Sequence, residues 1–386
     1  MLSIAFFSEC YHPIRNGVVV SVASFARVLT EMGHEVTIFT ARHPDQDEKG
    51  DAETGVYRFP AVMPPTRAKY PIAFPIATGK ARKLLAEHHF DIIHSNSPML
   101  MGHVAIAYHK RRNIPLVFTY HTLIEEYAHY IPLPQTWVRR RAIRLSREYS
   151  NEADHIITPT EYVASRLRRY RVTKPITVIP TGIDIDLMAK VPDGDIRAQY
   201  DIPVDAPLLV YAGRIAREKN IPRILTSFRE VLRQEPKAYL LLSGGGPSED
   251  EIREALDELA IAGQVRMTGF VPREHIVQCM RAADVFVFAS QTETQGLVLG
   301  EAMACARPVV AVAASATTEL IDTGKEGILV PDADTPFADA VVKLIRQPEL
   351  RQTLGICAQK RAESLSAYRC TERLVGVYNQ VLACRS

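Results

Sequence analysis

Short apolar runs alternate with helical patterns along the whole chain, and this alternation limits its fold more than any other feature. Runs of this length between helices are typical of buried parallel strands in doubly wound sheets. The chain is therefore predicted to be an α/β protein of two doubly wound, Rossmann-like domains that face a central cleft, with ligands at the carboxyl ends of the strands. The runs cover residues 2–8, 35–40, 90–95, 115–121, 154–159, 208–213, 238–243, 265–269, 284–289, 308–312 and 327–330.

A segment rich in proline and aspartate separates the two series of runs. Residues 191–207 contain three prolines and four aspartates, so we interpret them as part of a linker that begins near Gly182. A chain of 386 residues also exceeds one ordinary hydrophobic core. We expect a first domain over 1–182 and a second over 183–368, with a last helix in 369–386 that packs back onto the first.

The charge of the chain is unevenly distributed. The formal net charge is +2, but residues 1–175 hold 23 Lys and Arg against 16 Asp and Glu, which leaves 23 against 28 in residues 176–386. The basic first half is expected to meet something anionic. No stacking or groove-reading module is visible, so nucleic acid is the weaker interpretation.

The cysteines and the N-terminus indicate the compartment. The six cysteines show no paired short spacing, so we interpret them as reduced thiols and not as disulfides or zinc ligands. The N-terminus lacks the basic start and cleavage site of a signal peptide, and no apolar run approaches the ~18 residues of a spanning helix. We expect a cytoplasmic protein whose contact with a membrane is peripheral.

The segment from Glu293 to Glu301 carries the strongest functional signal. It follows the run 284–289 and opens a helical pattern, so its backbone N–H groups would stand at a helix N-terminus, where a pyrophosphate is favoured. We expect Glu301 to accept hydrogen bonds from ribose hydroxyls and Glu293 to reach the sugar. A pair of solvated glutamates at a helix start is the alternative. The predicted donor contacts are Glu293, Thr294, Gln295, Gly296, Leu297 and Glu301.

Two further loops follow apolar runs in the second half. The loop after 208–213 begins with Gly213 and holds Arg214 and Lys219, whose cations are placed to meet the oxygens of a leaving diphosphate. A merely solvated basic loop is the alternative. The glycine run around Gly245 permits close approach of a nucleotide, or it is a plain turn; it lacks the lysine of a phosphate-hydrolysing P-loop.

Polar residues also follow two runs of the first half. Asn16 is placed to cap the first helix, and Gly17 at the start of that helix is expected to contact a phosphate or the acceptor, unless it serves only as a turn. His121 ends the run 115–121. We expect it to face the cleft, although a single histidine is more often structural.

The sequence Asp184-Ile185-Asp186 resembles the Asp-x-Asp pattern that holds a divalent metal in another class of sugar transferase. It opens the linker, so we assign it to hinge and capping roles. No cluster of His, Asp and Glu accompanies it, and Arg214, Lys219 and the helix end already offset the charge of a diphosphate. We therefore predict no metal site and no cofactor besides a nucleotide-sugar substrate.

Basic and aromatic residues interleave in two segments of the first half. Residues 137–147 form a basic amphipathic helical pattern, and residues 64–83 mix Tyr, Phe and Pro with Arg and Lys. Basic side chains near an anionic membrane contribute ~1 kcal/mol each, and aromatic side chains suit its interface. We expect membrane docking here, with a solvated helix face as the alternative. The predicted membrane contacts are Trp137, Arg139, Arg140, Arg141 and Arg144.

Taken together, these motifs resemble the family-4 retaining glycosyltransferases of the two-Rossmann GT-B architecture. The likeness rests on Glu293 and Glu301 with seven residues between them, and on Arg214 and Lys219 in Gly-Arg-x-x-x-Glu-Lys-Asn. Ser-Gly-Gly-Gly-Pro at 243–247, Asn-Gly near the N-terminus and Ile-Pro-Thr-Gly-Ile-Asp at 179–184 extend it. The resemblance implies a nucleotide-sugar donor held mainly by the second domain, an acceptor held mainly by the first, and transfer with retention of anomeric configuration.

The resemblance also implies the chemistry of transfer. In such enzymes the favoured attack is from the face of the leaving group, a phosphate oxygen takes the acceptor proton, and no protein base is needed. The chain departs from many relatives at Asn16-Gly17, where they have Gly-Gly, and at His121-Thr122, where they have His-Asp. The implied roles are leaving-group stabilisation for Arg214 and Lys219, ribose binding for Glu301, hexose binding for Glu293, a place beside the sugar for His121 and a phosphate contact for Gly17.

The segments 119–132 and 292–297 are similar to the diacylglycerol glucosyltransferases of this family. We therefore expect metal-independent transfer of glucose from UDP-glucose to the 3-hydroxyl of 1,2-diacylglycerol at the inner face of the cell membrane. The alternatives are a GDP-mannose-dependent mannosyltransferase acting on a lipid or glycan, a nucleotide-sugar epimerase, and a non-catalytic sugar-nucleotide binder. The sequence leaves the oligomeric state open. The predicted acceptor contacts are Glu125, Glu126, Tyr127 and Tyr130.

Overall fold

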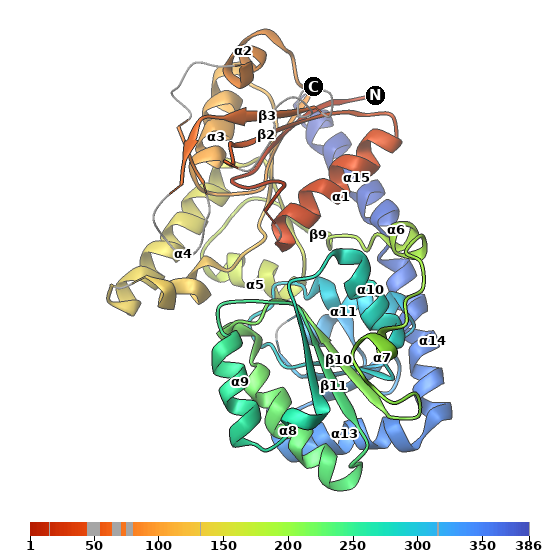
Figure 1. Ribbon diagram of the computed structural model, residues 1–386. Helices are drawn as coiled ribbons and strands as arrows, with labels where there is room; N and C mark the ends of the chain where they lie inside the picture. Colours follow the sequence, from red (N-terminus) through yellow and green to blue (C-terminus); the bar gives the residue numbers. More distant parts are fainter. Residues whose placement is uncertain are drawn as a thin grey trace. The chain divides into compact units, whose positions relative to one another are not determined.

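A computed structural model describes residues 1–14, 16–44, 55–63, 71–74, 80–131, 133–314 and 316–385. The chain forms two compact units (Figure 1). The first unit comprises Met1–Gly182 and Ala367–Ser386, and the second unit comprises Ile183–Ser366. The sequence predicted the boundary between the two domains after Gly182, and it predicted that the chain returns to the first domain near residue 369.

The first unit is built on a seven-stranded parallel sheet in the order β3-β2-β1-β6-β7-β8-β9. The order reverses between β1 and β6, because the chain runs outward through β2 and β3 before it returns to the other side of β1. A short antiparallel pair of strands, β4 (Ala61–Val62) and β5 (Ile72–Ala73), lies outside this sheet. The strands of the sheet are β1 (Ser3–Phe7), β2 (Glu35–Ala41), β3 (Val56–Phe59), β6 (Ile92–Ser95), β7 (Leu116–Thr119), β8 (His155–Thr158) and β9 (Ile176–Val178).

Alternate residues of the central strand face two separate cores. Ile4 and Phe6 pack into one core with α1 and α15, which lie side by side in Figure 1, whereas Ala5 and Phe7 pack into the other core. This alternation follows from the pleat of a strand whose two faces are both covered. The helices are α1 (Gly17–Glu31), α2 (Lys80–Glu87), α3 (Leu100–Arg112), the 3₁₀ helix η2 (Ile124–Tyr130), α4 (Gln135–Glu152), α5 (Glu161–Arg169) and α15 (Ala367–Ala383).

The C-terminal helix α15 is anchored in the first unit by a buried polar chain. The Tyr378 hydroxyl lies 2.5 Å from His94 Nδ1, and the other ring nitrogen of His94 lies 2.6 Å from Thr119 Oγ1. Burial lowers the pKa of His94 to about 3, so the ring is neutral and one of its nitrogens can accept a hydrogen bond. These bonds satisfy polar atoms that would otherwise be buried without partners.

The second unit repeats the plan with a six-stranded parallel sheet in the order β12-β11-β10-β13-β14-β15. Its order reverses between β10 and β13. The predicted α/β class with two Rossmann-like halves is confirmed. The strands are β10 (Leu208–Ala212), β11 (Tyr239–Ser243), β12 (Val265–Gly269), β13 (Val285–Phe288), β14 (Val309–Val312) and β15 (Gly327–Val330).

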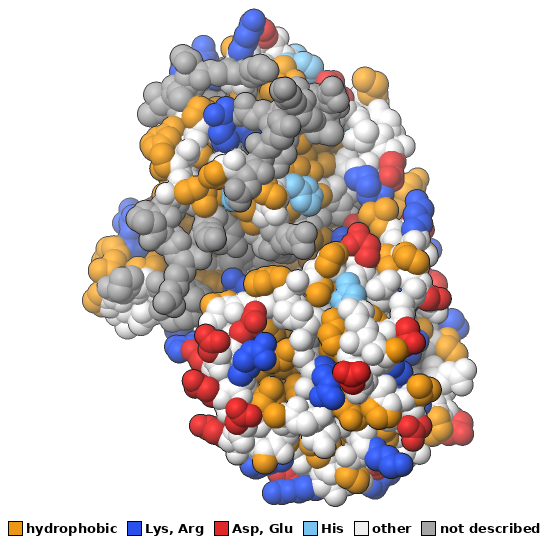
Figure 2. Space-filling view, viewed as in Figure 1, with side chains coloured by type: hydrophobic (Ala, Val, Ile, Leu, Met, Phe, Trp, Pro, Cys, Tyr) orange, Lys and Arg blue, Asp and Glu red, His pale blue; other side chains and the backbone are white. Residues whose placement is uncertain are grey.

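Helices cover the sheet of the second unit, and acidic and basic side chains are interspersed over its visible surface (Figure 2). Within the described ranges, no helix of the chain is long and apolar enough to cross a membrane. The helices are α6 (Ile185–Ala189), α7 (Ile196–Gln199), η3 (Arg217–Lys219), α8 (Ile221–Gln234), α9 (Glu249–Glu258), η4 (Ala262–Gln264), α10 (Arg273–Ala282), α11 (Leu297–Ala304), α12 (Thr317–Leu320), α13 (Asp334–Arg346) and α14 (Pro348–Ser364).

The assignment of residues 191–207 to a linker is wrong. Ile196 and Ile202 are buried in the core of the second unit, and Arg197 forms an ion pair of 3.1 Å with Asp284. Arg281 also donates a hydrogen bond to the Val191 carbonyl. Ile196 and Ile202 attach this mostly exposed segment to the core, although two isoleucines are too few to produce a clear periodicity in the sequence.

Candidate functional site

Two loops of the second unit leave the sheet where its strand order reverses. In sheets of this kind, ligands bind beside the carboxyl ends of the two strands that flank the reversal. Here these strands are β10, which is followed by the basic loop 213–220, and β13, which is followed by the loop 289–296. The Ser290 hydroxyl joins the loops by donating to the Glu218 carbonyl at 2.9 Å.

Lys219 and Glu293 meet between these two loops. Lys219 Nζ lies 2.5 Å from Glu293 Oε1, and both side chains are largely shielded from solvent. The sequence predicts Lys219 at a diphosphate and Glu293 at a sugar, but no pattern in it indicates that the two side chains pair. The ion pair places the cation and the carboxylate at one point of the strand edge.

Arg214 is held on the same loop by its own carboxylate partner. Its guanidinium pairs with Glu218, whose side chain is buried, and the Tyr211 hydroxyl donates to the Arg214 carbonyl at 3.0 Å. About half of the Arg214 side chain remains exposed, so its cation is accessible from solvent. Glu218 was not among the predicted site residues, although its place in the Glu-Lys-Asn motif could have suggested a role.

The helix that follows Glu293 begins where the sequence indicated. Gly296 is the N-cap of α11, with a φ of 75°, and Leu297 is the first helical residue. Glycine adopts this left-handed conformation at little cost, whereas other residues rarely do. The first backbone N–H groups of α11 thus stand beside Glu293, as a pyrophosphate site requires. Their binding of a diphosphate remains a prediction, as do the contacts assigned to Thr294 and Gln295.

Glu301, on α11, forms part of a small charged cluster. Arg273 Nη2 donates to Glu301 Oε1 at 2.8 Å, and Arg273 Nη1 lies 3.8 Å from Asp184 Oδ2. Burial raises the pKa of Glu301, whereas Arg273 opposes this shift and Asp184 adds to it. Asp184 is the N-cap residue of α6, where a capping role was expected, but within the described chain its side chain makes no capping hydrogen bond to that helix. Neither Asp184 nor Arg273 was predicted to accompany Glu301.

The glycine run at 244–246 packs against the loop that follows β10. A Cβ atom on Gly244 would lie 2.1 Å from the Gly213 carbonyl oxygen, and one on Gly246 would lie 2.2 Å from the Ile215 carbonyl oxygen. Gly245 lies against the ring of Phe270, which follows β12 and is 81% exposed. The run therefore has a packing role, and contact between Gly245 and a nucleotide stays a prediction. No pattern in the sequence singled out Phe270.

The first unit presents its own polar residues where its strand order reverses. Glu9 follows β1, Asn96 follows β6 and His121 follows β7. His121 Nε2 lies 2.9 Å from Asn96 Oδ1, and burial lowers the pKa of His121 to about 4. Glu9 accepts a hydrogen bond from the Met101 backbone at 2.6 Å, and burial raises its pKa to about 7. The sequence pointed to His121 but missed Glu9 and Asn96.

The start of α1 has the predicted cap. Asn16 Oδ1 accepts a hydrogen bond from the Val19 backbone at 2.9 Å, and Gly17 is the first residue of the helix. Asn16 therefore performs a task that a glycine at the same position could not, which gives this departure from the family pattern a structural reason.

Glu125, for which an acceptor contact stays a prediction, is held inside the first unit. Glu125 is 3% exposed, accepts a hydrogen bond from Arg166 at 3.0 Å and also pairs with Tyr170. Arg166 holds Glu126 as well, at 3.1 Å. Both carboxylates thus attach η2 to α5. Tyr127 is partly buried, and the side chain of Tyr130 lies outside the described residues.

One face of α4 is basic and exposed, as predicted. Val138, Ala142 and Tyr149 are buried on its other face. Trp137 is 54% exposed, and Ile131 and Leu133, just before the helix, are also exposed. Most of the predicted basic segment 64–83 lies outside the described residues. The exposed arginines are Arg139, Arg140, Arg141 and Arg144, the last of which pairs with Glu148.

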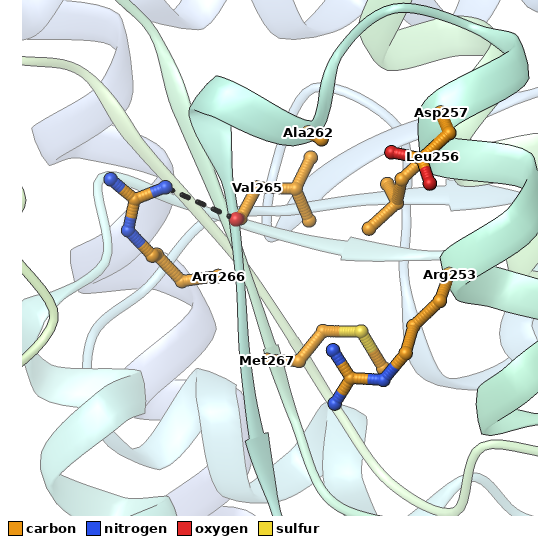
Figure 3. A pocket seen from close by; sticks show the side chains of 7 residues that line it. All are labelled: Arg253, Leu256, Asp257, Ala262, Val265, Arg266 and Met267. Carbon is orange, nitrogen blue, oxygen red and sulfur yellow. Dashed lines mark hydrogen bonds between the residues drawn. The ribbon is translucent and has the colours of Figure 1, made fainter.

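A surface depression of the second unit lies away from these residues (Figure 3). It is lined by α9, by Ala262 and by Val265, which begins β12, so it adjoins the amino end of the strand. Ligands in doubly wound sheets bind at the opposite, carboxyl edge, so we assign it no role. Within the described ranges, no group of three or more His, Cys, Asp and Glu residues could hold a metal ion. Metal independence itself stays a prediction.

Comparison with known proteins identifies relatives of both units. Residues 15–187 match the model of Glycosyltransferase Family 4, and residues 193–361 match that of Glycosyl transferases group 1. An alpha-monoglucosyldiacylglycerol synthase from Streptococcus pneumoniae is 30% identical over 360 residues, which cover 91% of this chain and 80% of the relative.

Two further likenesses extend the comparison. A D-inositol 3-phosphate glycosyltransferase from Saccharomonospora viridis is 29% identical over 388 residues, which cover 95% of this chain and 90% of that protein. The solved structure of Anabaena HepE in complex with UDP-glucose has a TM-score of 0.76 and 19% identity, and the match covers 98% of this chain and 100% of that one. The last likeness concerns the fold alone.

We predict that Gly246→Ala destabilises the second unit by about 1–3 kcal/mol, because the new methyl group would overlap the backbone of the loop after β10. Calorimetric unfolding of the purified protein measures the change. Gly263→Ala is the matched control, since a Cβ atom there would meet no atom within 4 Å. Equal unfolding temperatures for the two variants would show that the glycine run does not need its close packing.

Proposed function

The chain belongs to the family-4 glycosyltransferases, and on that premise we propose that it transfers glucose from UDP-glucose to the 3-hydroxyl of 1,2-diacylglycerol with retention of configuration. The observation that carries the donor side is the pairing of Lys219 with Glu293 beside the N-terminus of α11. It gathers a cation, a carboxylate and helix amides at one strand edge, which suits a diphosphate joined to a sugar.

In the proposed reaction, the donor diphosphate lies between the basic loop and α11. Arg214 and Lys219 stabilise the negative charge that develops on the diphosphate as it leaves, while Glu293 binds hydroxyls of the hexose and Glu301 those of the ribose. Each of the two cations now pairs with a carboxylate, Glu218 or Glu293. Both cations are therefore already positioned on their loop when a diphosphate binds.

The proposed transfer needs no protein base. The acceptor oxygen bonds to the anomeric carbon on the face from which the diphosphate oxygen departs, and the hydroxyl proton passes to a phosphate oxygen of the leaving group. This proposal is supported by the low pKa of His121, about 4, which makes its ring a weak base at neutral pH.

The proposed acceptor is a lipid at the inner face of the cell membrane. The relative from S. pneumoniae is named for monoglucosyldiacylglycerol synthesis, and the exposed Trp137 stands beside three exposed arginines on α4. An exposed aromatic side chain and exposed cations on one helix suit an anionic lipid surface. A phosphorylated polyol is the second candidate acceptor, because another relative is named for transfer to inositol 3-phosphate.

A donor and acceptor screen tests the proposal. We expect the purified protein to form monoglucosyldiacylglycerol from UDP-glucose and diacylglycerol in mixed anionic micelles that contain EDTA, and NMR of the product to show an α linkage. UDP-galactose, GDP-mannose and inositol 3-phosphate serve as the competing substrates. Transfer from GDP-mannose alone, or to inositol 3-phosphate alone, would contradict the proposal. Loss of activity in EDTA that Mg²⁺ restores would contradict the metal-free mechanism.

We expect Lys219→Ala to lower turnover ~10²-fold or more, because it removes a positioned cation from the leaving group. Arg217→Ala is the matched control, since Arg217 lies on the same 3₁₀ helix but is exposed and pairs with Glu251. Steady-state kinetics with saturating lipid measure both variants. If the two variants lose activity equally, Lys219 has no special role in departure of the diphosphate.

Replacement of Arg139, Arg140 and Arg141 by Gln should weaken binding to anionic vesicles by about two orders of magnitude, since each cation contributes ~1 kcal/mol. Binding of UDP should be unchanged. A variant with Lys237, Arg253 and Lys360 replaced by Gln removes the same charge from exposed positions of the second unit and should bind vesicles like the parent protein. Vesicle sedimentation measures the binding of both variants. If both lose the same affinity for vesicles, the effect comes from net charge and not from a docking surface on α4.

A further inference from the structure

Three charged side chains of the second unit converge from three different elements. Arg273 is the first residue of α10, Glu301 lies on α11, and Asp184 precedes α6. Arg273 lies between the two carboxylates, 2.8 Å from one and 3.8 Å from the other. Asp184 is 5% exposed, and less than a fifth of the Glu301 side chain is exposed. The guanidinium is thus the cation shared by two shielded acids.

Close packing of two neighbouring residues creates this convergence. A Cβ atom on Gly300 would lie 2.6 Å from the Ile183 side chain, so the glycine lets α11 approach the segment before α6. Gly300 precedes Glu301 and Ile183 precedes Asp184, so this contact brings the two acids towards each other. Two shielded carboxylates in this arrangement disfavour each other's ionisation unless a cation accompanies them.

Charged groups from the neighbouring elements act on the Glu301 carboxylate. Arg273 of α10 favours the ionised carboxylate, whereas Asp184 and burial disfavour it. Cys305, the C-cap residue of α11, is acted on by Arg281 and Arg307 as well as by Glu301. Within the described residues, Arg273 alone donates a hydrogen bond to the Glu301 carboxylate, and the bond reaches Oε1.

We propose that Arg273 is a positioning residue for the nucleotide: it keeps Glu301 ionised and fixes one carboxylate oxygen, so that the other accepts hydrogen bonds from the vicinal ribose hydroxyls of a nucleoside diphosphate. The inference rests on the proposed function, because it presupposes a nucleotide at Glu301. Arg273 acts through Glu301 and is not assigned a contact with the reacting atoms. Asp184 holds the guanidinium from its other side.

The direction of the pH dependence follows from these contacts. Without Arg273, burial and the charge of Asp184 raise the pKa of Glu301 further, so the carboxyl group becomes protonated as the pH falls. A protonated carboxyl group is a poorer acceptor for two hydroxyls. Loss of Arg273 should therefore weaken nucleotide binding most at low pH, whereas a merely structural loss would weaken it equally at every pH.

Calorimetric titration of the full-length protein with UDP tests the inference between about pH 6.5 and pH 8.5. When the pH is lowered across this range, we expect the affinity of Arg273→Met for UDP to fall about tenfold more than the affinity of the parent protein. Arg273→Lys keeps the charge and should restore most of the parent's pH profile. In Arg273→Met combined with Asp184→Asn, the repelling charge is gone, so the excess pH dependence should shrink.

Three results would overturn the inference. The first is an Arg273→Met protein that binds UDP with the parent's pH profile, and the second is one whose loss of affinity is the same at every pH. The third is an unchanged excess pH dependence when Asp184→Asn is added. If Arg273→Met does not fold, Arg273→Lys provides the test. The inference is then overturned if UDP binding by Arg273→Lys depends on pH as steeply as was expected for Arg273→Met. A parent protein that binds no UDP instead contradicts the proposed function, and the inference falls with it.

Discussion

Parallel pairing around a central strand is the constraint on which both units depend. Because β10 has β11 on one side and β13 on the other, the connections after β10 and β13 run to opposite faces of the sheet. The basic loop and the loop that holds Glu293 begin at this point, so residues 74 positions apart in the chain form an ion pair. In the first unit, β1 likewise has β2 on one side and β6 on the other, and Asn96, which follows β6, pairs with His121, which follows β7.

The cations of the candidate donor site are all matched by acids of the same unit. Arg214 pairs with Glu218, Lys219 with Glu293, and Arg273 with Glu301. A partly shielded cation without a partner would lose hydration without compensation, and several such cations would repel one another. The acids therefore allow three cations to occupy one strand edge of a folded unit. A diphosphate that enters has to compete with these carboxylates, which favours ligands that carry several negative charges.

Local patterns in the sequence predicted the features that depend on neighbouring residues in the chain. Apolar runs located the strands of the second unit, and the glycine before Leu297 located the start of α11. The short strands β3 and β9 and the attachment of residues 191–207 to the core of the second unit were missed, because few apolar residues mark them. The partners of Glu125 and Glu301 were also missed. Arg166 and Arg273 lie 41 and 28 residues away from these glutamates, and only tertiary packing brings such residues together.

The anchoring of α15 has a consequence for how the chain is made. The core of the first unit contains Leu374 and Tyr378, so it stays incomplete until the last helix has been synthesised. The second unit, Ile183–Ser366, is continuous in sequence and is fully available earlier. During synthesis the later half of the chain can therefore reach its native core first, while one apolar face of the N-terminal sheet is covered by α1 but not yet by α15. This order reverses the usual one, in which N-terminal domains fold first.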